Sequence, residues 1–387
     1  MTKVLVSLVG DQTVPNVFLI RDTAFRQITH YVFVTTPQME ERQRLTHILA
    51  ATGLKASSFT KTEVVADNPH HIRQQLEKLP ILRQADHVYV NLTSGTKVMS
   101  IGLYDYFTRP AFAERSSIFY IPIGGNAFAQ IFPEQAFQQR PITYRITLAE
   151  YLTSYGIKVM EQCNEQDLHQ TANYTSSIFP HFLIDGTQKK AFAKMMETLR
   201  GRYNGKQQKP DFEIPLLPEM QPFLKQIAYH PSVEGALQKR EIRYLTGGWL
   251  EEWTYLQVQQ YLQLPTEYIR FQVKVGRNNP QGVEVPNEFD LMFTLQNTLY
   301  VVECKTGLRR DSIKAQFEES IYKLAALRME FGQRVTAIFL TLSNLRDGKG
   351  QLRKPYANRA SLHRIKLFDR KGMLEEFPIY LQELASG

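Results

Sequence analysis

Residues 283–306, read VEVPNEFDLMFTLQNTLYVVECKT, constrain the fold most strongly, because two apolar runs there carry charges that the interior of a strand does not tolerate. The runs flank the turn Gln296-Asn297, and this pattern predicts a β-hairpin. The charged residues come in two pairs, and one position separates the members of each pair: Glu288 from Asp290, and Glu303 from Lys305.

The hairpin predicts a cluster of charges at the edge of a sheet. Side chains alternate between the faces of a strand, so each charged pair lies on one face, with its members roughly 6–7 Å apart. Val302 and Cys304 then point the other way, into a core. We expect the hairpin to bring Asp290, Glu303 and Lys305 to one exposed edge. Because buried charges are costly unless they are paired or bind a metal, this cluster indicates a function.

The same residues resemble the PD-(D/E)xK motif of the restriction-endonuclease-like nucleases. In that family a hairpin supplies an Asp, and later an acidic residue, one spacer and a Lys. Here these are Asp290, Glu303, Cys304 and Lys305, with 12 residues between the Asp and the Glu. Phe289 stands where the motif has its Pro, a residue that is often missing in the family.

The resemblance implies a metal-dependent nuclease. Asp290 and Glu303 would share a Mg²⁺ or Mn²⁺ ion, which prefers oxygen ligands and keeps several waters, and Glu288 is a further candidate ligand. Such an ion polarises a phosphodiester and lowers the pKa of a bound water, while Lys305 would orient that water or stabilise charge on phosphorus. For the E-x-K triplet alone, a salt-bridged strand face is the favoured alternative. The whole hairpin, followed by a helix, favours the nuclease.

Length and composition set only broad limits. A chain of 387 residues predicts two domains and a connector. No apolar run approaches the ~20 residues that span a membrane, so we expect no membrane association and, by default, a cytoplasmic protein. The two cysteines, Cys163 and Cys304, give neither a disulfide framework nor a zinc spacing. The net charge of +8 permits a polyanionic partner without singling one out.

The first third of the chain alternates strands with helices, which predicts an α/β doubly wound fold. Apolar runs predict five strands, at residues 3–9, 30–35, 58–65, 87–92 and 117–122. Helical spacing predicts helices between them, at residues 15–25, 38–52, 70–79 and 96–107. In such folds ligands bind beyond the carboxyl ends of the strands.

Two of these strand ends are rich in small polar residues. One is Gly10-Asp11-Gln12-Thr13, and the other, residues 91–97, reads NLTSGTK and opens a helix. The backbone N–H groups, hydroxyls and lysine of the second loop together favour a phosphate. The loop lacks the G-x-x-x-x-G-K-[ST] pattern of a P-loop. An ordinary helix cap is an equally good interpretation of the bare motif.

The second loop closely resembles the N-x-T-x-G-T-K-x-M signature of CARF domains, the Rossmann-like sensors of CRISPR-associated proteins. The matching residues are Asn91, Thr93, Gly95, Thr96, Lys97 and Met99, and the resemblance covers residues 1–148. It implies that a symmetric dimer binds a cyclic oligoadenylate, with Thr96 and Lys97 at the phosphates. Further pocket residues are implied in both loops, with weaker candidates at the second strand end: Gly10, Asp11, Thr13 and Ser94, and then Thr35, Thr36 and Gln38.

The remaining residues predict a connector at 149–232 and a restriction-endonuclease-like α/β nuclease domain at 233–387. Around and within the connector we expect three elements: a short strand and then a helix over 142–157, an amphipathic helix over 191–203, and a loop over 205–218. The nuclease domain is expected to contain, in order, a long helical stretch over 233–262, a strand over 268–275, the hairpin, a helix over 311–331 capped by Asp311 or Ser312, and strands over 334–341 and 364–368.

This order resembles the core of the nuclease family, whose first helix contributes a Glu to the metal site. Glu251 fits that role best, with a solvated position as the alternative, and Glu252 lies about 100° further around the helix. Residues after the hairpin are candidates for contacts with nucleic acid, although a solvated face is the favoured alternative for any one of them. They are Arg309, Arg310, Lys314, Gln316, Tyr322 and Lys323.

A CARF sensor in front of a PD-(D/E)xK domain resembles the cyclic-oligoadenylate-activated CRISPR ancillary nucleases, called Card or Can proteins. The resemblance implies a homodimer that cyclic tetra-adenylate activates allosterically and that hydrolyses DNA, by single-stranded cleavage or nicking, or RNA, or both. Two alternatives stay open: a cyclic-oligoadenylate-binding regulator with an inactive nuclease-like domain, and a sensor that degrades its own activator. The intact set of Asp290, Glu303 and Lys305 argues against the first.

Overall fold

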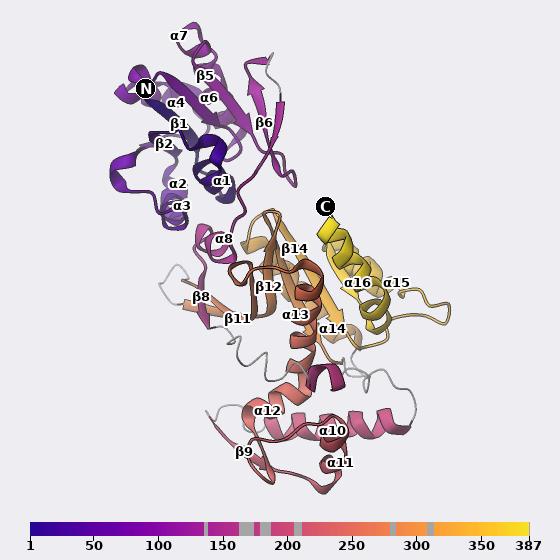
Figure 1. Cartoon of the computed structure of the whole chain (residues 1–387). Coiled ribbons are helices and arrows are strands. Elements are labelled where there is room, and N and C mark those ends of the chain that lie inside the picture. The colour runs from indigo at the N-terminus through magenta and orange to yellow at the C-terminus, as the bar shows by residue number, and fades with distance from the viewer. Residues whose placement is uncertain are drawn as a thin grey trace.

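The computed structural model describes residues 1–134, 138–161, 174–178, 187–204, 211–278, 284–307 and 313–386. The chain forms two α/β domains, which Figure 1 shows one after the other, with a smaller, mainly helical part beyond the second sheet. Within these ranges, none of the helices combines the length and the apolarity that crossing a bilayer requires. Several residues named above lie outside the described residues: Cys163, Arg309, Arg310, Asp311 and Ser312.

The N-terminal domain contains a seven-stranded sheet in the order β3-β2-β1-β4-β5-β6-β7. The strands from β3 to β5 run parallel, and β6 and β7 are antiparallel additions at one edge. The strands are β1 (Lys3–Leu8), β2 (His30–Thr35), β3 (Phe59–Glu63), β4 (His87–Asn91), β5 (Ser116–Tyr120), β6 (Ala127–Phe132) and β7 (Gln138–Pro141). The five parallel strands confirm the prediction, whereas β6 and β7 were not among the predicted strands.

Helices cover both faces of this sheet, which confirms the doubly wound fold. Leu5 of β1 packs with one set of helices, α1 and α3, whereas Val4 and Val6 pack with α4 and α6 on the other face. The helices are α1 (Val14–Arg21), α2 (Pro37–Glu41), α3 (Arg44–Thr52), α4 (Pro69–Glu77), α5 (Pro80–Gln84), α6 (Lys97–Phe107) and α7 (Pro110–Ala113). Residues 38–52 form two helices rather than the predicted one, because Gln43 between them is left-handed (φ 54°).

The C-terminal domain contains a six-stranded sheet in the order β15-β14-β13-β12-β11-β8. The strands are β8 (Lys158–Glu161), β11 (Ile269–Asn278), β12 (Glu284–Leu295), β13 (Thr298–Lys305), β14 (Val335–Thr341) and β15 (Ile365–Phe368). The predicted hairpin is β12 and β13, and β13 pairs in parallel with β14 on its other side. β8, which lies within the segment predicted as the connector, adds an edge strand through its pairing with β11.

Helices also cover both faces of the second sheet. One face packs against α13 (Trp249–Leu262) and α16 (Arg370–Ser386), where the rings of Trp253 and Phe377 meet. The other packs against α14 (Ile313–Glu330) and α15 (Lys354–Leu362), where Phe317 meets Tyr356. The long terminal helix α16 is an element that the sequence analysis does not anticipate.

Residues 233–262 do not form the predicted continuous helical stretch. Residues 236–238 form β10 (Ala236–Gln238), which pairs with β9 (Glu213–Pro215) inside the predicted loop over 205–218. Helix begins only at α12 (Lys239–Arg243), because the Glu241 carboxylate accepts hydrogen bonds from Gln238 N (2.7 Å) and Ser232 N (2.8 Å). A π-helical turn, Tyr244–Gly248, then leads into α13, so the two glycines there widen the helix without ending it.

The remaining part of the connector contains α10 (Thr187–Asn204) and α11 (Gln221–Gln226), which pack with α12 and α13 in one apolar core. α10 confirms the amphipathic helix predicted over 191–203. Residues 142–147, in contrast, belong to no strand, so the short strand predicted there is wrong. Sheet pairing ends at Pro141, opposite Ala127.

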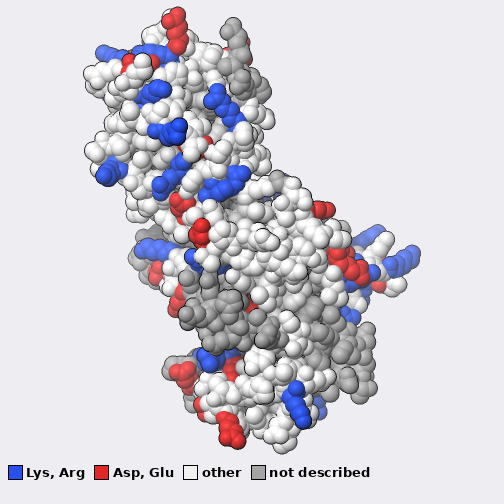
Figure 2. All heavy atoms as spheres, viewed as in Figure 1, with Lys and Arg blue, Asp and Glu red and all other residues white. Residues whose placement is uncertain are grey.

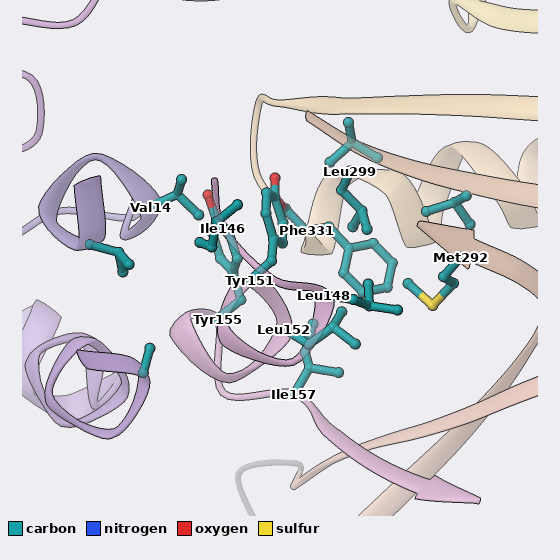
Figure 3. Close-up of a cluster of buried hydrophobic side chains, with 14 of the residues drawn as sticks. Val14, Ile146, Leu148, Tyr151, Leu152, Tyr155, Ile157, Met292, Leu299 and Phe331 are labelled. Atoms are coloured by element: carbon teal, nitrogen blue, oxygen red, sulfur yellow. The ribbon is translucent and has the colours of Figure 1, made fainter. Parts of the chain in front are cut away.

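A continuous apolar core joins the two domains through α8 (Leu148–Ser154). Figure 3 shows this core: side chains of α8 lie between Val14 of the N-terminal domain and Phe331 of the C-terminal domain. The α8 side chains are Leu148, Tyr151 and Leu152, with Tyr155 directly after the helix and Met292 and Leu299 from the hairpin. The hairpin that carries the predicted nuclease motif therefore packs directly against the helix that leaves the first domain.

Asn297, in the turn of the hairpin, adds side-chain hydrogen bonds to this core. Its side chain is 1% exposed and its φ is 65°. Its Oδ1 accepts a hydrogen bond from Ile146 N (2.9 Å), and its Nδ2 donates to Asn126 Oδ1 (2.7 Å) and to Tyr144 O (2.9 Å). These bonds satisfy polar groups of both domains at a site closed to water.

His47 of α3 lies at the same junction. Gly156, after α8, packs so closely on the ring that a Cβ there would lie 2.3 Å from His47 Cε1. Burial, and then the charges of Arg44 and Arg277, lower the pKa of His47 to about 4. Arg277 belongs to β11, so a charge of the second domain acts on a histidine of the first.

We predict that Asn297→Gly destabilises the chain although it keeps the positive φ accessible. The variant loses three side-chain hydrogen bonds and leaves buried partners unsatisfied, so the free energy of unfolding should fall by about 2–4 kcal/mol. Denaturant unfolding followed by tryptophan fluorescence measures this. Gln296→Gly, at the neighbouring and exposed turn position, should change stability by less than about 1 kcal/mol. Equal losses for the two variants would contradict the role of the Asn297 side chain.

We also predict that His47 makes stability depend on pH. An unfolded histidine has a pKa of about 6.5, so between about pH 6.5 and 4 the unfolded chain binds a proton that folded His47 does not. This contribution is complete above that range and is lost as the pH falls through it. Thermal melting across this range should therefore drop less for His47→Gln than for wild type, while His70→Gln on α4 should follow wild type. Parallel curves for wild type and His47→Gln would rule the effect out.

Candidate active site and ligand cavity

The hairpin brings together the charged residues that its sequence predicts. Leu291 lies opposite Val302, and the turn residues Gln296 and Asn297 both have positive φ, as a tight two-residue hairpin turn requires. Val302 and Cys304 point into the core under α13, as predicted, and Cys304 Sγ lies 3.4 Å from Thr254 Oγ1. The opposite direction is left for Glu303 and Lys305.

Asp290, Glu303 and Lys305 are held by short polar contacts. Asp290 Oδ2 accepts a hydrogen bond from the backbone N–H of Cys304 at 2.6 Å, which ties the two strands together beyond their regular ladder. Lys305 Nζ lies 2.6 Å from Glu303 Oε1. Lys323 of α14 is a second cation near that oxygen, at 4.0 Å.

The cluster does not lie at an exposed edge, as the hairpin alone predicts. Glu303 is only 5% exposed. The reason is that β13 is an interior strand: Glu303 lies opposite Phe339 of β14, and α14 covers this part of the sheet. The burial makes the negative charge of Glu303 more costly than a surface position would.

The strand alternation that predicts which side chains share a face fails at Asp290. Phe289 packs in the core with Phe331, whereas Leu291, two positions on, packs in the core on the other face of the sheet. The partner strand β11 exchanges faces at the same level, between Phe271 and Val273, where Gln272 has a φ of 48°. Both strands therefore exchange faces where Asp290 lies, while their register is the same before and after this level.

Glu251 of α13 joins the cluster. Its Oε2 accepts a hydrogen bond from Gln272 Nε2 at 2.7 Å, so the left-handed residue of β11 also positions this carboxylate. Burial raises the pKa of Glu251. Burial, and then the charges of Glu251 and Glu303, raise the pKa of Asp290 well above its usual range. For Lys305, burial alone would lower the pKa, but Glu303 and Asp290 outweigh it and raise the pKa. Three carboxylates thus lie near Lys305, and Lys323 and Arg243 are further cations beside Glu303 and Glu251.

Of the two remaining acidic candidates, Glu288 lies near enough to raise the pKa of Glu251, whereas Glu252 points away from the cluster. Glu288 is half exposed and forms an ion pair with Arg243, so it is already neutralised by another cation. Glu252 is 2% exposed, and its Oε1 accepts a hydrogen bond from Thr175 Oγ1 at 2.8 Å. The structure thus separates Glu251, beside Asp290, from its neighbour Glu252, which supports the connector.

The donor set of the cluster fits a hard divalent cation, because its oxygens are carboxylates and negative charge is in excess. Among the described residues, no group of three His, Cys, Asp and Glu side chains is arranged to hold a metal ion. The pair Asp290 and Glu303 therefore remains the predicted ligand set. Mg²⁺ is commonly held by one or two carboxylates and completed by water and phosphate oxygens.

The connector contributes a contact that the sequence analysis does not predict. Arg200 of α10 donates from its guanidinium to Thr306 Oγ1 (2.7 Å) and to Thr246 O (2.8 Å). Thr306 directly follows Lys305, so α10 fixes the end of the hairpin against the π-helical turn before α13. No local pattern indicates this contact, because the partners lie 106 positions apart.

Other predicted substrate contacts lie on α14 or outside the described residues. Tyr322 is 45% exposed, and Arg359 of α15 lies over its ring. Lys314 is exposed near the start of α14. On the face shown in Figure 2, Lys and Arg of the described residues are scattered among Asp and Glu.

In the N-terminal domain, the two predicted ligand loops lie side by side at the carboxyl ends of β1 and β4. A Cβ on Gly10 would lie 2.5 Å from Gly95 N, and Gly95 has a φ of 84°, so both positions require glycine. Ser94 Oγ donates to Gln12 O at 2.7 Å and joins the loops. Thr96 caps α6 by accepting from Met99 N at 3.2 Å.

A cavity of about 660 Å³ opens over these loops. Its volume falls in the range of small-molecule sites. Seven of the residues predicted for ligand binding line it: Gly10, Asp11, Thr93, Ser94, Gly95, Thr96 and Lys97. The weaker candidates Thr36 and Gln38 line it as well, and Asp11 forms ion pairs with Arg42 (2.9 Å) and Arg44 (3.1 Å).

Three predicted ligand residues are buried beneath the cavity instead of lining it. Thr13 Oγ1 donates to Ser154 Oγ of α8 at 3.2 Å. Thr35 Oγ1 donates to Glu40 Oε1 at 2.8 Å. Asn91 Nδ2 donates to Ser7 Oγ (2.9 Å), and its Oδ1 accepts from Thr93 N (3.0 Å). Their positions fit a role in holding the loops, since each uses its polar atoms within the protein.

The cavity also has lining residues that were not named above as ligand candidates. Gln12 lies in the first loop between the predicted residues, and Tyr155 follows α8. Gln333 and Arg334 come from the C-terminal domain. Gln12 and Gln333 are 321 positions apart, so no local sequence pattern predicts that Gln333 and Arg334 reach this cavity.

Comparisons with known proteins agree with this arrangement. Residues 4–151 match the family model "Card1 CARF domain", and residues 238–367 match "Card1-like, endonuclease domain". Together the two models cover more than half of the chain. A search of curated proteins gave no match.

Solved structures with a similar fold cover nearly the whole chain. Protein VC1899 from Vibrio cholerae is 20% identical with a TM-score of 0.73, covering 99% of this chain and 96% of that one. Can2 from Sulfobacillus thermosulfidooxidans, in complex with cyclic tetra-adenylate, is 20% identical with a TM-score of 0.68, covering 98% and 99%.

A third structure is described as a type III CRISPR defence DNA nuclease activated by cyclic oligoadenylate. It is 19% identical with a TM-score of 0.53, and the match covers 94% of this chain but 52% of that one. At these identities the structural likenesses establish the fold, and the family models identify its two parts. The chain belongs to the family of proteins in which a Card1 CARF domain precedes a Card1-like endonuclease domain.

Proposed function

We propose that this chain is a metal-dependent nuclease that cyclic tetra-adenylate activates, and that it acts in type III CRISPR antiviral defence. The observation that carries the proposal is the cluster of the buried Glu303 with the partly buried Asp290 and Glu251 beside Lys305, in a domain of the endonuclease family. A cluster with more carboxylates than cations is costly in a folded protein unless it binds a cation.

Asp290 and Glu303 would hold a Mg²⁺ or Mn²⁺ ion, with Glu251 beside them. Glu288 is the weakest ligand candidate because Arg243 neutralises it. When bound, the ion supplies a Lewis acid for the phosphodiester and lowers the pKa of a coordinated water. Lys305, whose pKa is raised by its acidic neighbours, keeps a positive charge where negative charge develops on phosphorus. Gln272 holds Glu251 in place, and Cys304 N holds Asp290.

The cavity over the two loops would bind the activator. Thr96 and Lys97, both exposed at the N-terminal end of α6, supply a cation and the positive end of the helix for phosphates, while the Thr96 hydroxyl donates to Ala66 O (3.2 Å) and accepts from Met99 N (3.2 Å). A cyclic nucleotide is supported by the Can2 complex with cyclic tetra-adenylate. We infer that a homodimer binds the ring and that the substrates are DNA, RNA or both. The description of one relative as a DNA nuclease supports DNA as a substrate class.

We predict that Asp290→Asn and Glu303→Gln lower the rate of metal-dependent cleavage by about 100-fold or more, because each removes a charged ligand from the site. Cleavage of plasmid and of labelled RNA with Mn²⁺ and cyclic tetra-adenylate measures this. Glu318→Gln, which removes a carboxylate that pairs with Arg359 on the same domain, should cleave like wild type. Wild-type cleavage by Glu303→Gln would place the active site elsewhere.

The same variants should separate metal binding from folding. Because the folded site disfavours a charged Asp290, Asp290→Asn should melt at a higher temperature than wild type in the absence of metal. Added Mn²⁺ should stabilise wild type and leave the variant almost unchanged. Thermal melting with and without Mn²⁺ measures both effects. A variant that Mn²⁺ stabilises as much as wild type would contradict Asp290 as a ligand.

We predict that Lys97→Met weakens the binding of cyclic tetra-adenylate by about ten-fold or more, because a charge-assisted contact to phosphate is lost. Isothermal titration calorimetry at low and at high salt measures the affinity, and its salt dependence should be smaller for the variant. Lys78→Met, at the exposed end of α4, is the matched control and should bind like wild type. Equal affinities of the Lys97 variant and wild type would remove this loop from the phosphate site.

A further inference from the structure

The turn between α14 and β14, residues 331–334, reaches from the endonuclease domain into the ligand cavity. Gln333 and Arg334 line the cavity together with the two CARF loops. Gln333 is exposed there, so its side chain is accessible to a ligand. The cavity is therefore built from both domains of one chain.

Gln12 joins this turn to the CARF loops. Its side-chain Oε1 accepts hydrogen bonds from the backbone N–H of Gln333 (3.0 Å) and from the hydroxyl of Tyr155 (3.2 Å). Its backbone oxygen accepts from Ser94 Oγ of the second loop. A single residue of the first loop thus contacts the second loop, the residue after α8 and the endonuclease turn.

The turn is held rigidly at this place. Tyr151 OH lies 3.0 Å from both Phe331 O and Arg334 O. Gly332 has a φ of 87° and packs so closely on Tyr155 that a Cβ would lie 2.0 Å from the tyrosine hydroxyl oxygen. Figure 3 shows Tyr151 and Tyr155 beside Phe331.

Arg334 fixes the other side of the turn. Its guanidinium donates to Gly125 O and to Pro122 O (3.4 Å), in the segment between β5 and β6, and it lies 5.3 Å from the ring centroid of Phe18. Because Pro122 also lines the cavity, Arg334 is clamped to a CARF segment that a ligand contacts. A displacement of the CARF loops would therefore act on the turn at two residues, Gln333 and Arg334.

Both elements that flank the turn contact β13, the strand that carries Glu303 and Lys305. β14 pairs with β13 from Val335, opposite Leu299, to Thr341, opposite Lys305. α14 carries Lys323, whose Nζ lies 4.0 Å from Glu303 Oε1. Packed secondary elements of this kind transmit displacement as units, since close-packed interiors deform little.

We propose that the turn of residues 331–334 is a wall of the activator site supplied by the endonuclease domain, and that Gln12 couples occupancy of the cavity to the cleavage site within one chain. The proposal rests on the proposed function and specifies its regulation. The bound polyanion contacts Gln333 directly, and the Gln12 contact carries the resulting shift into α14 and β14. By linkage, occupancy of the cleavage site changes activator affinity by the same factor.

Substitutions that change the charge of residue 333 test whether the turn is part of the activator site. In the full chain, Gln333→Glu should weaken the binding of cyclic tetra-adenylate and Gln333→Lys should tighten it, each by about three-fold or more at low salt. Calorimetric titration measures both affinities. Gln382→Glu and Gln382→Lys, on the exposed face of α16, carry the same charge changes outside the cavity and should bind like wild type. Unchanged affinity for both Gln333 variants would contradict the proposal that this turn forms part of the activator site.

Substitutions that remove or keep the hydrogen-bond acceptor of residue 12 test the coupling between the cavity and the cleavage site. At saturating cyclic tetra-adenylate, the ratio of stimulated to unstimulated cleavage should fall by about ten-fold for Gln12→Leu, which removes the acceptor. Gln12→Glu keeps an acceptor oxygen and should retain the ratio. Gln27→Leu, which removes another CARF glutamine that bonds to Tyr89 OH, is the matched control and should behave like wild type. A wild-type ratio for Gln12→Leu would overturn the coupling.

Two further comparisons keep the test decisive. If Gln12→Leu fails to bind the activator, Gln12→Met removes the amide acceptor with a side chain of similar length, and a wild-type stimulation ratio for that variant overturns the coupling. Failure of the proposed function is distinct: a wild-type chain that binds cyclic tetra-adenylate without cleaving nucleic acid contradicts the nuclease. The affinities of the Gln333 variants still decide whether the turn is part of the activator site.

Discussion

Desolvation of acidic side chains is the constraint on which this architecture depends. Glu303 is interior, Asp290 titrates well above its usual range, and Glu251 approaches both from α13. Lys305, Lys323 and Arg243 offset part of this negative charge, and fixed polar contacts hold the carboxylates in place. The Cys304 backbone N–H and the Gln272 side chain supply two of these contacts. The exchange of faces in β11 and β12 lies at the same level, so this irregularity of the sheet occurs where the charge cluster lies.

Much of the site was predictable, because its parts are local in sequence. The hairpin and its acidic and basic residues follow from alternation, a two-residue turn and a known spacing. The burial of Glu303 was not predictable, because it depends on β14 and α14, which pair and pack from elsewhere in the chain. Alternation also fails at Asp290, where a left-handed Gln272 on the partner strand exchanges the faces. In the CARF domain, the loop residues follow from strand ends, whereas Gln333 and Arg334 come from a distant turn.

The fold shows the same division. Strands with continuous apolar runs were found with nearly their observed bounds. The stretch before α12 has helical composition but forms β10, because Glu241 caps the chain at Gln238 and Ser232. Tertiary contacts outweigh propensity there. The connector shows the weakest hydrophobic periodicity in the chain. Even so, its Arg200 bonds to the end of the hairpin and its Thr175 bonds to Glu252. Segments with weak periodicity can therefore carry contacts that position a site.

The edge strand β8 has a consequence for how such proteins diversify. It follows the last CARF helix by a few residues and completes the endonuclease sheet through β11, beside the apolar core that α8 shares with both domains. A recombination event at the apparent domain border would strip a strand from one sheet and expose the core of the other. Exchange of sensors between relatives is therefore expected to carry residues 142–161 along with the CARF part, so that the evolutionary module is longer than the sensor fold itself.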